Sequence, residues 1–298
     1  MNRDSAAGTP PTLSFIGAGR AASALAVAAQ GAGYDVVAIN GRNAERARAL
    51  AQAVGARVVS SPFAAVNAAC LTVVAVPDAA VRGVAATLAA NGAALAGRGL
   101  VHTAAMLGSG ALAAARLTGV AVGVLHPLQA LAGVDSADLL PGSYFRLEGE
   151  GVLRAQLEAL VAALGAQVLD VPAEARVAYH AAAVLAGNAP LALLARARSV
   201  LEAAGVDGAE AQAALAVLLH GAATNALRSG AREALTGPVA RGDAVAVAAH
   251  LEVLGSDPSA LELYATLARE TAELAGRDPA DLGLEQRERD GSHVRRVA

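Results

Sequence analysis

Short apolar runs alternate with longer Ala-rich segments over the first half of the chain. The runs LSFIG, DVVAI, ARVV, CLTVVAV, GLVHT and VAVGVL follow one another between Thr12 and about Leu125. They are continuously apolar rather than alternating, as in strands that are covered on both faces. Strand and helix signals at this spacing predict an α/β fold with a doubly wound parallel sheet. One more strand is predicted over 144–148, followed by a helix near 153–164 and a strand over 167–171.

The pattern changes after Pro172, where long Ala/Leu segments follow one another without a strand signal. These segments predict an all-helical C-terminal domain. We therefore expect the following stretches along the chain: a flexible N-terminus 1–11, an α/β domain 12–150, a connecting helix and strand 151–172, a helical substrate and dimerisation domain 173–276, and a flexible polar tail 277–298 that contains His293.

Composition narrows the possible function classes. The chain has 55% hydrophobic and 16% charged residues, a formal net charge of −3 and a pI near 6.1. It is too apolar to be disordered, and it lacks the basic excess that is typical of nucleic-acid-binding proteins. All 23 cationic residues are Arg, so mechanisms that require a lysine amine are excluded. We expect no nucleic acid among its partners.

Cysteine content and hydropathy bear on the compartment. A single cysteine, Cys70, and a polar start without a secretion signal predict a cytoplasmic protein. The most membrane-like window, 177–195, contains Tyr179, His180 and Asn188, and most of its apolar residues are weakly hydrophobic Ala. We expect this window to form a buried helix, and we expect no membrane partner.

A glycine turn follows the first predicted strand and precedes a predicted helix. Gly17, Gly19 and Ala22 form the pattern G-x-G-x-x-A. In such a turn the first glycine permits a tight bend, the second lets the backbone approach a pyrophosphate, and the small third residue allows close packing of helix on strand. The motif predicts that 12–150 is a Rossmann-like dinucleotide-binding domain with Ala18 also at the cofactor. The alternative is that the glycines only close a βα turn.

The end of the second predicted strand bears on the choice of cofactor. A site that prefers NAD usually presents Asp or Glu there, about twenty residues after the glycines. The sequence instead places Asn40 at this strand end and Arg42 just beyond it. A guanidinium can make charge-assisted hydrogen bonds to a 2′-phosphate, so we predict NADP (as NADPH) as the cofactor. Alternatively, Arg42 is a solvated residue that opens the next helix. Arg20 could contact the same nucleotide or cap the surface.

Candidate ligand-binding residues follow the later strands, because ligands of open α/β sheets lie outside the carboxyl ends of the strands. These residues are Val76, Pro77 and Asp78 after the fourth strand, His102 and Thr103 after the fifth, and His126 and Gln129 after the sixth. Val76, Pro77 and His102 are assigned to the cofactor, Thr103 to catalysis, His126 to catalysis and substrate, and Gln129 to substrate. Asp78 alternatively caps a helix, and His102 is alternatively a satisfied core histidine. His126 is expected in a turn before Pro127.

Several phrases carry a resemblance that covers nearly the whole chain. VHTAAMLG begins at Val101, VLHPLQALAG at Val124, AYHAAAVLAGN at Ala178 and ALTGPVARGD at Ala234. Together with the glycine turn they resemble bacterial proteins that join a Rossmann-like domain to the domain of unknown function 2520. The resemblance implies a helical domain similar to that of pyrroline-5-carboxylate reductase and, more distantly, to those of ketopantoate reductase and the β-hydroxyacid dehydrogenases of the 6-phosphogluconate dehydrogenase C-terminal-domain-like superfamily. It also implies an NAD(P)-dependent oxidoreductase that forms a homodimer through the helical domain.

The chain departs from these relatives at two places. Ala104 and Ala105 follow His-Thr where the family usually has Ser-Gly, which removes a hydroxyl near the nicotinamide. Val184 stands four residues before Asn188, where the hydroxyacid dehydrogenases carry Lys. Another group must therefore donate the proton in a reduction.

His180 is the first candidate for that proton donor. On one helix it would lie about 80° from Asn188, so that both could line one cleft. An imidazole can act as a general acid near neutral pH. Alternatively, both residues are polar anchors between helices. Arg241 could clamp a substrate carboxylate, or it could pair with a neighbouring acid, either Asp243, the expected cap of the next helix, or Glu252.

These observations favour an NADP(H)-dependent oxidoreductase that transfers a hydride to or from a small carbonyl, imine or hydroxy substrate. An imine reductase similar to pyrroline-5-carboxylate reductase is the alternative among enzymes. A different class is a non-catalytic sensor or structural dimer that binds NADP without turnover. No metal is expected, because the sequence contains no H-x-x-x-H or C-x-x-C motif.

Overall fold

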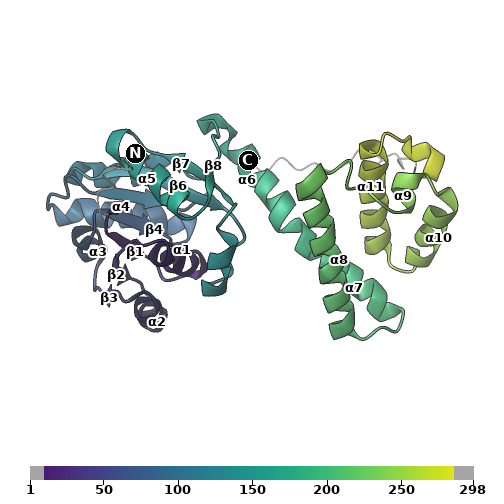
Figure 1. Ribbon diagram of the computed structural model, residues 1–298, viewed down its shortest axis with the longest axis horizontal. Helices are drawn as coiled ribbons and strands as arrows, with labels where there is room; N and C mark the ends of the chain where they lie inside the picture. Colours follow the sequence, from purple (N-terminus) through teal and green to yellow (C-terminus); the bar gives the residue numbers. More distant parts are fainter. Residues whose placement is uncertain (1–9, 285–298) are drawn as a thin grey trace, which may run out of the picture. The chain divides into compact units, whose positions relative to one another are not determined.

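A computed structural model describes residues 10–284 and divides the chain into two compact units between Gly187 and Asn188 (Figure 1). The first unit is built on an eight-stranded sheet of order β3-β2-β1-β4-β5-β6-β7-β8. Its strands are β1 (Leu13–Ile16), β2 (Val36–Asn40), β3 (Arg57–Val58), β4 (Leu71–Val74), β5 (Gly99–His102), β6 (Ala121–Leu128), β7 (Tyr144–Glu148) and β8 (Gln167–Val168). The predicted doubly wound sheet is confirmed.

One strand pair departs from the parallel arrangement. β1 to β6 pair in parallel, whereas β7 runs antiparallel to β6 and places Arg146 opposite His126. β8 then pairs in parallel with β7. His126 and Pro127 therefore lie inside a strand, and the expectation that His126 stands in a turn is wrong. That expectation depended on Pro127, which here lies within β6.

Helices cover both faces of the sheet. They are α1 (Arg20–Gly31), α2 (Ala44–Val54), α3 (Pro62–Ala68), α4 (Asp78–Asn91) and α5 (Gly151–Ala163), with 3₁₀ segments η1 (Ser109–Thr118) and η2 (Val134–Leu139). Successive residues of a strand enter opposite layers: Val73 belongs to the core cluster that includes residues of α1, α2 and α5, and Val74 to the one that includes residues of α3, α4 and η1. Burial on both faces explains why the strands read as continuous apolar runs.

The first unit ends with η3 (Ala173–Ala175) and α6 (Arg176–Gly187). The compact division thus falls later than the predicted limits at 150 and 172, since α5, β8 and α6 all belong with the sheet. Asn188 lies outside α6 and precedes a separate helix with Pro190 in its first turn. Proline lacks the N–H that a continuing helix needs, so the expectation that His180 and Asn188 share one helix is wrong.

The second unit is helical over 188–284. Its elements are α7 (Ala189–Ala203), α8 (Gly208–Ser229), α9 (Pro238–Arg241), α10 (Ala244–Leu254), α11 (Pro258–Leu274) and η4 (Pro279–Leu282). Its core cluster is small and consists of Val239, Val247, Ala268, Ala272, Leu282 and Leu284. Residues 277–284, predicted as part of a flexible tail, instead contribute two buried leucines. The rest of that predicted tail, including His293, and residues 1–9 of the predicted flexible N-terminus lie outside the described residues.

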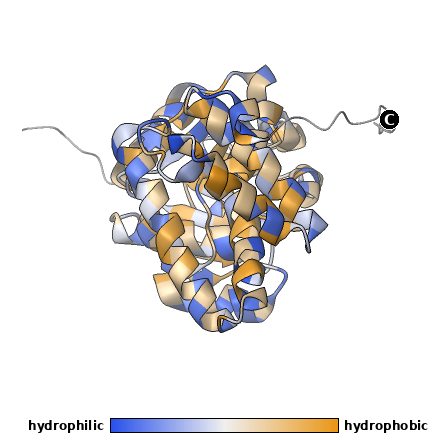
Figure 2. Cartoon of the chain, turned by 90° about the vertical axis from the view of Figure 1, so that its right-hand side faces the viewer, coloured by the Kyte–Doolittle hydropathy of each residue, from blue (hydrophilic) through white to orange (hydrophobic). Residues whose placement is uncertain are grey.

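The apolar stretch Ala173–Ala203 is exposed rather than buried. It is long and apolar enough to cross a membrane by length and composition, and only 6% of its most apolar window is buried. α6 and α7 contain no fully buried residue. The expectation of a buried helix is therefore wrong for the single chain. Hydrophobic residues occur along many of the helices in Figure 2, and Val177, Leu185 and Leu191 of this stretch are each more than half exposed.

Candidate active site at the carboxyl ends of the strands

The turn between β1 and α1 requires glycine at its first position. Gly17 has φ +111°, and a Cβ there would collide with the carbonyl oxygen of Ala75. Its N–H donates a hydrogen bond of 2.7 Å to the carbonyl of Asn40 at the end of β2. The turn is thus fixed against the ends of β2 and β4. Val76 lies over it, with Cγ1 3.3 Å from the position of such a Cβ.

Gly19 serves a different purpose, because the space around it is empty. It is the N-cap residue of α1 at φ −87°, and a Cβ at this position would meet no atom within 4 Å. No side chain caps the helix there, so its first N–H groups are free to bind an anion. Ala22 is fully buried and allows close packing of α1. An open backbone cradle with free donors fits a pyrophosphate, which is the group that NADP would place here.

Two arginines flank this cradle. Arg20 opens α1 and Arg42 follows β2, and both are exposed. Neither has an ion pair or side-chain hydrogen bond among those found in residues 10–284. The N-cap of α2 is Asn43, whose side chain accepts from the N–H of Arg46, so Arg42 lies before the helix rather than opening it. Asn40 donates from Nδ2 to the carbonyl of Val59.

The end of β4 leads directly into a helix. Pro77 is the N-cap residue of α4, and Asp78 is its first helical residue without a capping bond. The alternative interpretation of Asp78 as the cap is therefore wrong by one position. Pro77 is exposed and Val76 is half-buried, so both are accessible at the edge to which they were assigned.

His102 organises the loop after β5. Its side chain is fully buried; Nδ1 accepts from the N–H of Ala104 at 3.2 Å, and Nε2 donates to the carbonyl of Gly108 at 3.0 Å. Burial lowers the pKa of His102, so the ring is neutral. Both nitrogens are satisfied within the loop, and the ring offers no exposed surface to a ligand. Thr103, next in the chain, is half-buried at the loop entrance.

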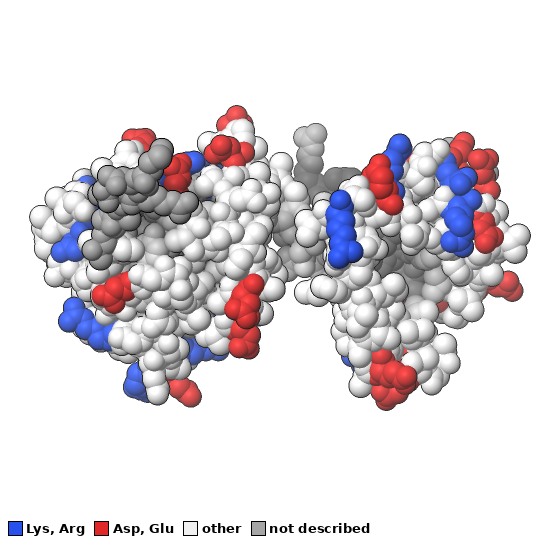
Figure 3. Space-filling model, in the orientation of Figure 1, with Lys and Arg blue, Asp and Glu red and all other residues white. Residues whose placement is uncertain are grey.

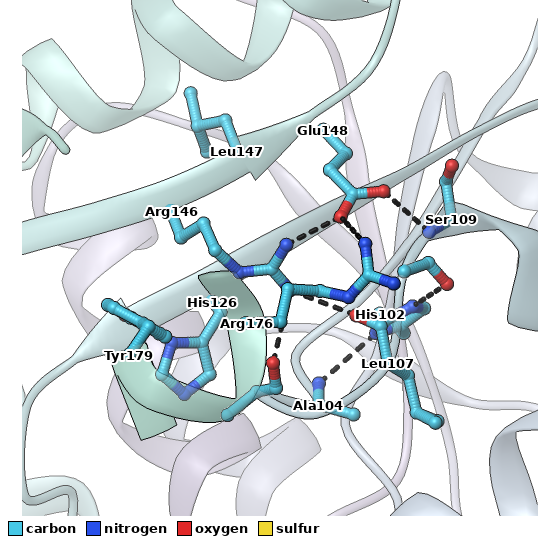
Figure 4. A network of polar contacts seen from close by, with 12 residues as sticks. His102, Ala104, Leu107, Ser109, His126, Arg146, Leu147, Glu148, Arg176 and Tyr179 are labelled. Atoms are coloured by element: carbon cyan, nitrogen blue, oxygen red, sulfur yellow. Dashed lines mark hydrogen bonds and ion pairs between the residues drawn. The ribbon is translucent and has the colours of Figure 1, made fainter. Parts of the chain in front are cut away.

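His126 contacts a tyrosine that the sequence did not select. Nδ1 of His126 lies 2.8 Å from the Oη of Tyr179 on α6, and the rings meet edge to face with centroids 5.5 Å apart (Figure 4). Burial, which is the largest cause, together with the charges of Arg146, His180 and His102 lowers the pKa of His126 to about 4. The imidazole is therefore neutral at physiological pH.

Arg146 and Glu148 complete the cluster. Arg146 is 1% exposed; its Nη1 pairs with Oε1 of Glu148, and its Nη2 donates to the carbonyl of Leu107 at 2.9 Å. Glu148 also accepts from the N–H of Ser109 at 2.7 Å and lies 3.7 Å from Nη1 of Arg176. Figure 4 shows both guanidinium groups directed at this carboxylate. Burial opposes ionisation of Glu148, but the Ser109 and Arg146 hydrogen bonds hold its pKa below the usual value.

The remaining assigned residues lie apart from this cluster or border it. Gln129 braces its own loop by donating to Leu139 and accepting from Ala130. His180 is half-buried, and its buried Nδ1 lacks a hydrogen-bond partner in the described chain. Asn188 and Arg241 belong to the second unit and are exposed.

The structural alternative for Arg241 is not seen. Among the described residues it forms no ion pair with Asp243 or Glu252. Asp243 instead caps α10, as the sequence predicts, by accepting from the N–H of Ala246. Residues 10–284 contain no group of three side chains that could hold a metal ion.

Sequence reasoning missed four residues of the cluster: Arg146, Glu148, Arg176 and Tyr179. One signal was present in β7, where two charged residues alternate with buried Phe145 and Leu147. Charged residues are unusual in a buried strand. Where they occur, they are usually paired with one another, and such pairs are frequent at functional sites. Tyr179 lies in the apolar window described from the sequence, but its contact with β6 depends on tertiary packing and cannot be predicted from that window.

Comparison with known proteins agrees with the geometry. Residues 12–106 match the family described as NADP oxidoreductase, coenzyme F420-dependent, and residues 143–271 match the domain of unknown function DUF2520. No curated protein matches.

Solved structures share the whole architecture. A Bacteroides fragilis protein assigned as an NADP oxidoreductase is 26% identical with a TM-score of 0.69, over 89% of this chain and 99% of its own. A Thermotoga maritima protein is 25% identical with a TM-score of 0.66, over 89% and 98%. A reductive aminase from Aspergillus terreus, solved with NADPH, is 21% identical with a TM-score of 0.63, over 92% and 98%, and shares the fold. The chain therefore joins a Rossmann-type region that matches NADP oxidoreductases to a region that matches DUF2520.

Proposed function

We propose that this oxidoreductase transfers a hydride between NADP(H) and a small carbonyl, imine or hydroxy compound at the carboxyl ends of β5 and β6. The observation that carries the proposal is the empty space over Gly19 at the uncapped start of α1, on the sheet edge where His102 and His126 also lie. Bound NADPH would supply the hydride, and the chain would supply orientation and electrostatics.

Each part of this edge has a task in the proposal. The free N–H groups of the first turn of α1 bind the pyrophosphate, and Arg42, with Arg20 beside it, binds the 2′-phosphate. His102 holds the loop that begins at Thr103, whose hydroxyl is the nearest replacement for the serine that Ala104 lacks.

An imine is the substrate class that we favour. The chain contains no lysine, and His126 is neutral at physiological pH. A lysine ammonium and a His126 imidazolium are therefore both excluded as the acid. An imine nitrogen is more basic than a carbonyl oxygen, so a neutral imine can take its proton from a weaker acid than a ketone requires. Pyrroline-5-carboxylate reductase from Streptococcus pyogenes shares the fold at 17% identity and a TM-score of 0.61. The alternative is a sensor that binds NADP without turnover.

Substitution of Gly19 by Ala tests the cofactor site directly. The backbone at φ −87° accepts Ala, and the added methyl meets no protein atom, so stability should stay unchanged. The methyl would occupy the proposed phosphate space, so NADPH affinity, measured by calorimetry, should fall at least about tenfold. Gly31→Ala, at the other end of α1 and also without close neighbours, is the matched control. Equal affinity of both variants would contradict the proposed site.

Cofactor preference and turnover are measured on the same material. Arg42→Ala should weaken NADPH binding about ten- to a hundredfold and leave NADH affinity unchanged, because only the 2′-phosphate loses a contact.

A panel of cyclic imines, ketones and hydroxy acids decides between enzyme and sensor. Oxidation of NADPH by each compound is followed by the absorbance of the reduced nicotinamide. Binding of NADPH without oxidation by any compound would favour the sensor.

A further inference from the structure

We propose that Tyr179 is the catalytic acid of this site and that His126 positions it. The proposal rests on the proposed function, because it assigns the proton that accompanies the hydride. It replaces His180, which the sequence favoured, with the residue before it on α6.

Geometry places Tyr179 at the reacting edge. The Oη of Tyr179 meets Nδ1 of His126 at 2.8 Å, and the edge-to-face packing of the rings, at 81°, fixes the phenol in one orientation. His126 lies in β6, beside β5 and the loop that starts at Thr103. Both residues belong to the first unit, as does the glycine turn of the cofactor site. Tyr179 is half-buried.

The charges around the phenol suit an acid that must become an anion. Tyr179 faces His126 from β6 and Arg146 from β7, and His180 is its neighbour on α6. Glu148 pairs with Arg146 and lies 3.7 Å from Nη1 of Arg176 (Figure 4). Burial raises the pKa of Tyr179, which keeps the phenol protonated at neutral pH, and the fixed charge of Arg146 lowers it, which favours the tyrosinate.

His126 itself is a poor acid here. With a pKa of about 4, the ring is the neutral imidazole at neutral pH and has no imidazolium proton to donate. With its proton on Nδ1, the neutral ring donates to the Oη of Tyr179. The O–H of the tyrosine is then free to point at a substrate atom, and the same donor stabilises the oxygen after it loses the proton.

The proton balance of a reduction is simple. The substrate carbon of a C=N or C=O bond gains the hydride, and the double bond becomes a single bond. The nitrogen or oxygen gains the proton from the Oη of Tyr179, whose O–H bond breaks. The tyrosinate, held by His126 and Arg146, regains a proton from water. In the oxidative direction the tyrosinate accepts the proton from the hydroxyl or amine.

The chain offers a matched control for the test. His250 and Tyr264, in the second unit, form the same kind of pair, with Nδ1 and Oη 2.8 Å apart and ring centroids 5.6 Å apart. Tyr179→Phe should lower kcat about a hundredfold or more and leave the NADPH dissociation constant unchanged. Tyr264→Phe should change neither. His180→Asn should retain most activity.

Two further readouts distinguish catalysis from structure. Wild-type kcat for reduction should fall as pH rises through the pKa of Tyr179, which lies above its ordinary value of 10. In the protein without cofactor, ultraviolet absorbance follows the deprotonation of the tyrosines as pH rises. The titration step of Tyr179 should be present in the wild type and absent in Tyr179→Phe. His126→Leu, which removes the hydrogen bond, should move that titration to higher pH and lower kcat about tenfold.

The outcomes separate the inference from the function on which it rests. If the wild type reduces a substrate and Tyr179→Phe matches Tyr264→Phe in kcat, the inference is overturned and the proposed function stands. If His180→Asn loses activity instead, the proton donor is His180. If NADPH binds but no compound of the panel oxidises it, the proposed function fails and this inference fails with it.

Discussion

The neutral ring of His126 couples folding stability to pH. Its pKa is about 4 in the folded chain and 6.5 ordinarily, so the unfolded chain binds a proton first as pH falls. Stability that is present above about pH 6.5 is therefore lost progressively toward pH 4. Between about pH 7 and pH 5 we expect a loss of about 2 kcal/mol in the free energy of unfolding from this residue.

Urea denaturation of the wild type and of His126→Leu at both pH values checks this expectation. The variant lacks the titrating ring and should lose less stability over the same interval. His102, whose pKa burial also lowers, adds a change of the same sign in both proteins, so the difference between them isolates His126. Parallel losses in the two proteins would show that the ring is not held neutral.

Local sequence patterns predict some site residues and miss others for a physical reason. Gly17 and Gly19 could be predicted because a turn between strand and helix is decided by a few neighbouring residues. The contact of His126 with Tyr179 spans 53 positions. The sequence of one helix cannot tell whether Tyr179 or His180 faces β6, because that depends on how the helix packs.

At the scale of elements, the ion pair between Arg146 and Glu148 lies within β7, and both side chains form hydrogen bonds to the loop after β5. Arg146 is 1% exposed and has Glu148 as its carboxylate partner, while its Nε is buried without a hydrogen-bond partner in the described chain. Removing one partner of a buried pair leaves an uncompensated charge. Glu148→Gln should therefore lower the free energy of unfolding by about 3 kcal/mol, measured by urea denaturation.

A surface pair provides the control for this prediction. Arg154 and Glu158 of α5 are 29% and 50% exposed, so Glu158→Gln should cost less than about 1 kcal/mol. The double variant Arg146→Met with Glu148→Gln should recover part of the lost stability, because no buried charge remains. A similar small loss for Glu148→Gln and Glu158→Gln would show that the buried pair contributes little.

Most elements could be predicted from hydrophobic patterning, and the exceptions share a cause. The strands were found because runs covered on both faces are continuously apolar. The antiparallel direction of β7 and the 3₁₀ form of η1 leave no trace in such a pattern. The break between α6 and α7 at Asn188 was missed because Ala-rich sequence on both sides has high helix propensity.

At the scale of the whole molecule, the second unit leaves a large apolar surface unpaired. Its core cluster is small, and Leu191, Val217, Leu218 and Leu227 are each more than half exposed. An apolar groove between α7 and α8 is lined by Pro190, Leu193, Leu194, Ala197, Leu215, Leu218, Leu219 and Ala222. All of these lining residues are uncharged, a class drawn in white in Figure 3. We propose that a second copy of the chain covers this surface.

Analytical ultracentrifugation tests the dimer. The wild type should sediment at twice 29.3 kDa, and Leu218→Glu should weaken association at least about tenfold, because the groove would bury an unpaired charge. Leu117→Glu, at an 85% exposed leucine of η1 in the first unit, should leave association unchanged. A monomeric wild type at micromolar concentration would contradict the proposal.

The anchored loop after β5 has a consequence for how this scaffold could change its substrate. His102 and Arg146 hold the backbone of Ala104, Ala105, Leu107 and Gly108 from two sides through buried hydrogen bonds. Folding has therefore already removed the conformational entropy that an induced fit would have to overcome. New selectivity at this edge would arise by exchanging small side chains on a rigid frame, and a single serine in place of Ala104 would restore a hydroxyl without redesign of the main chain.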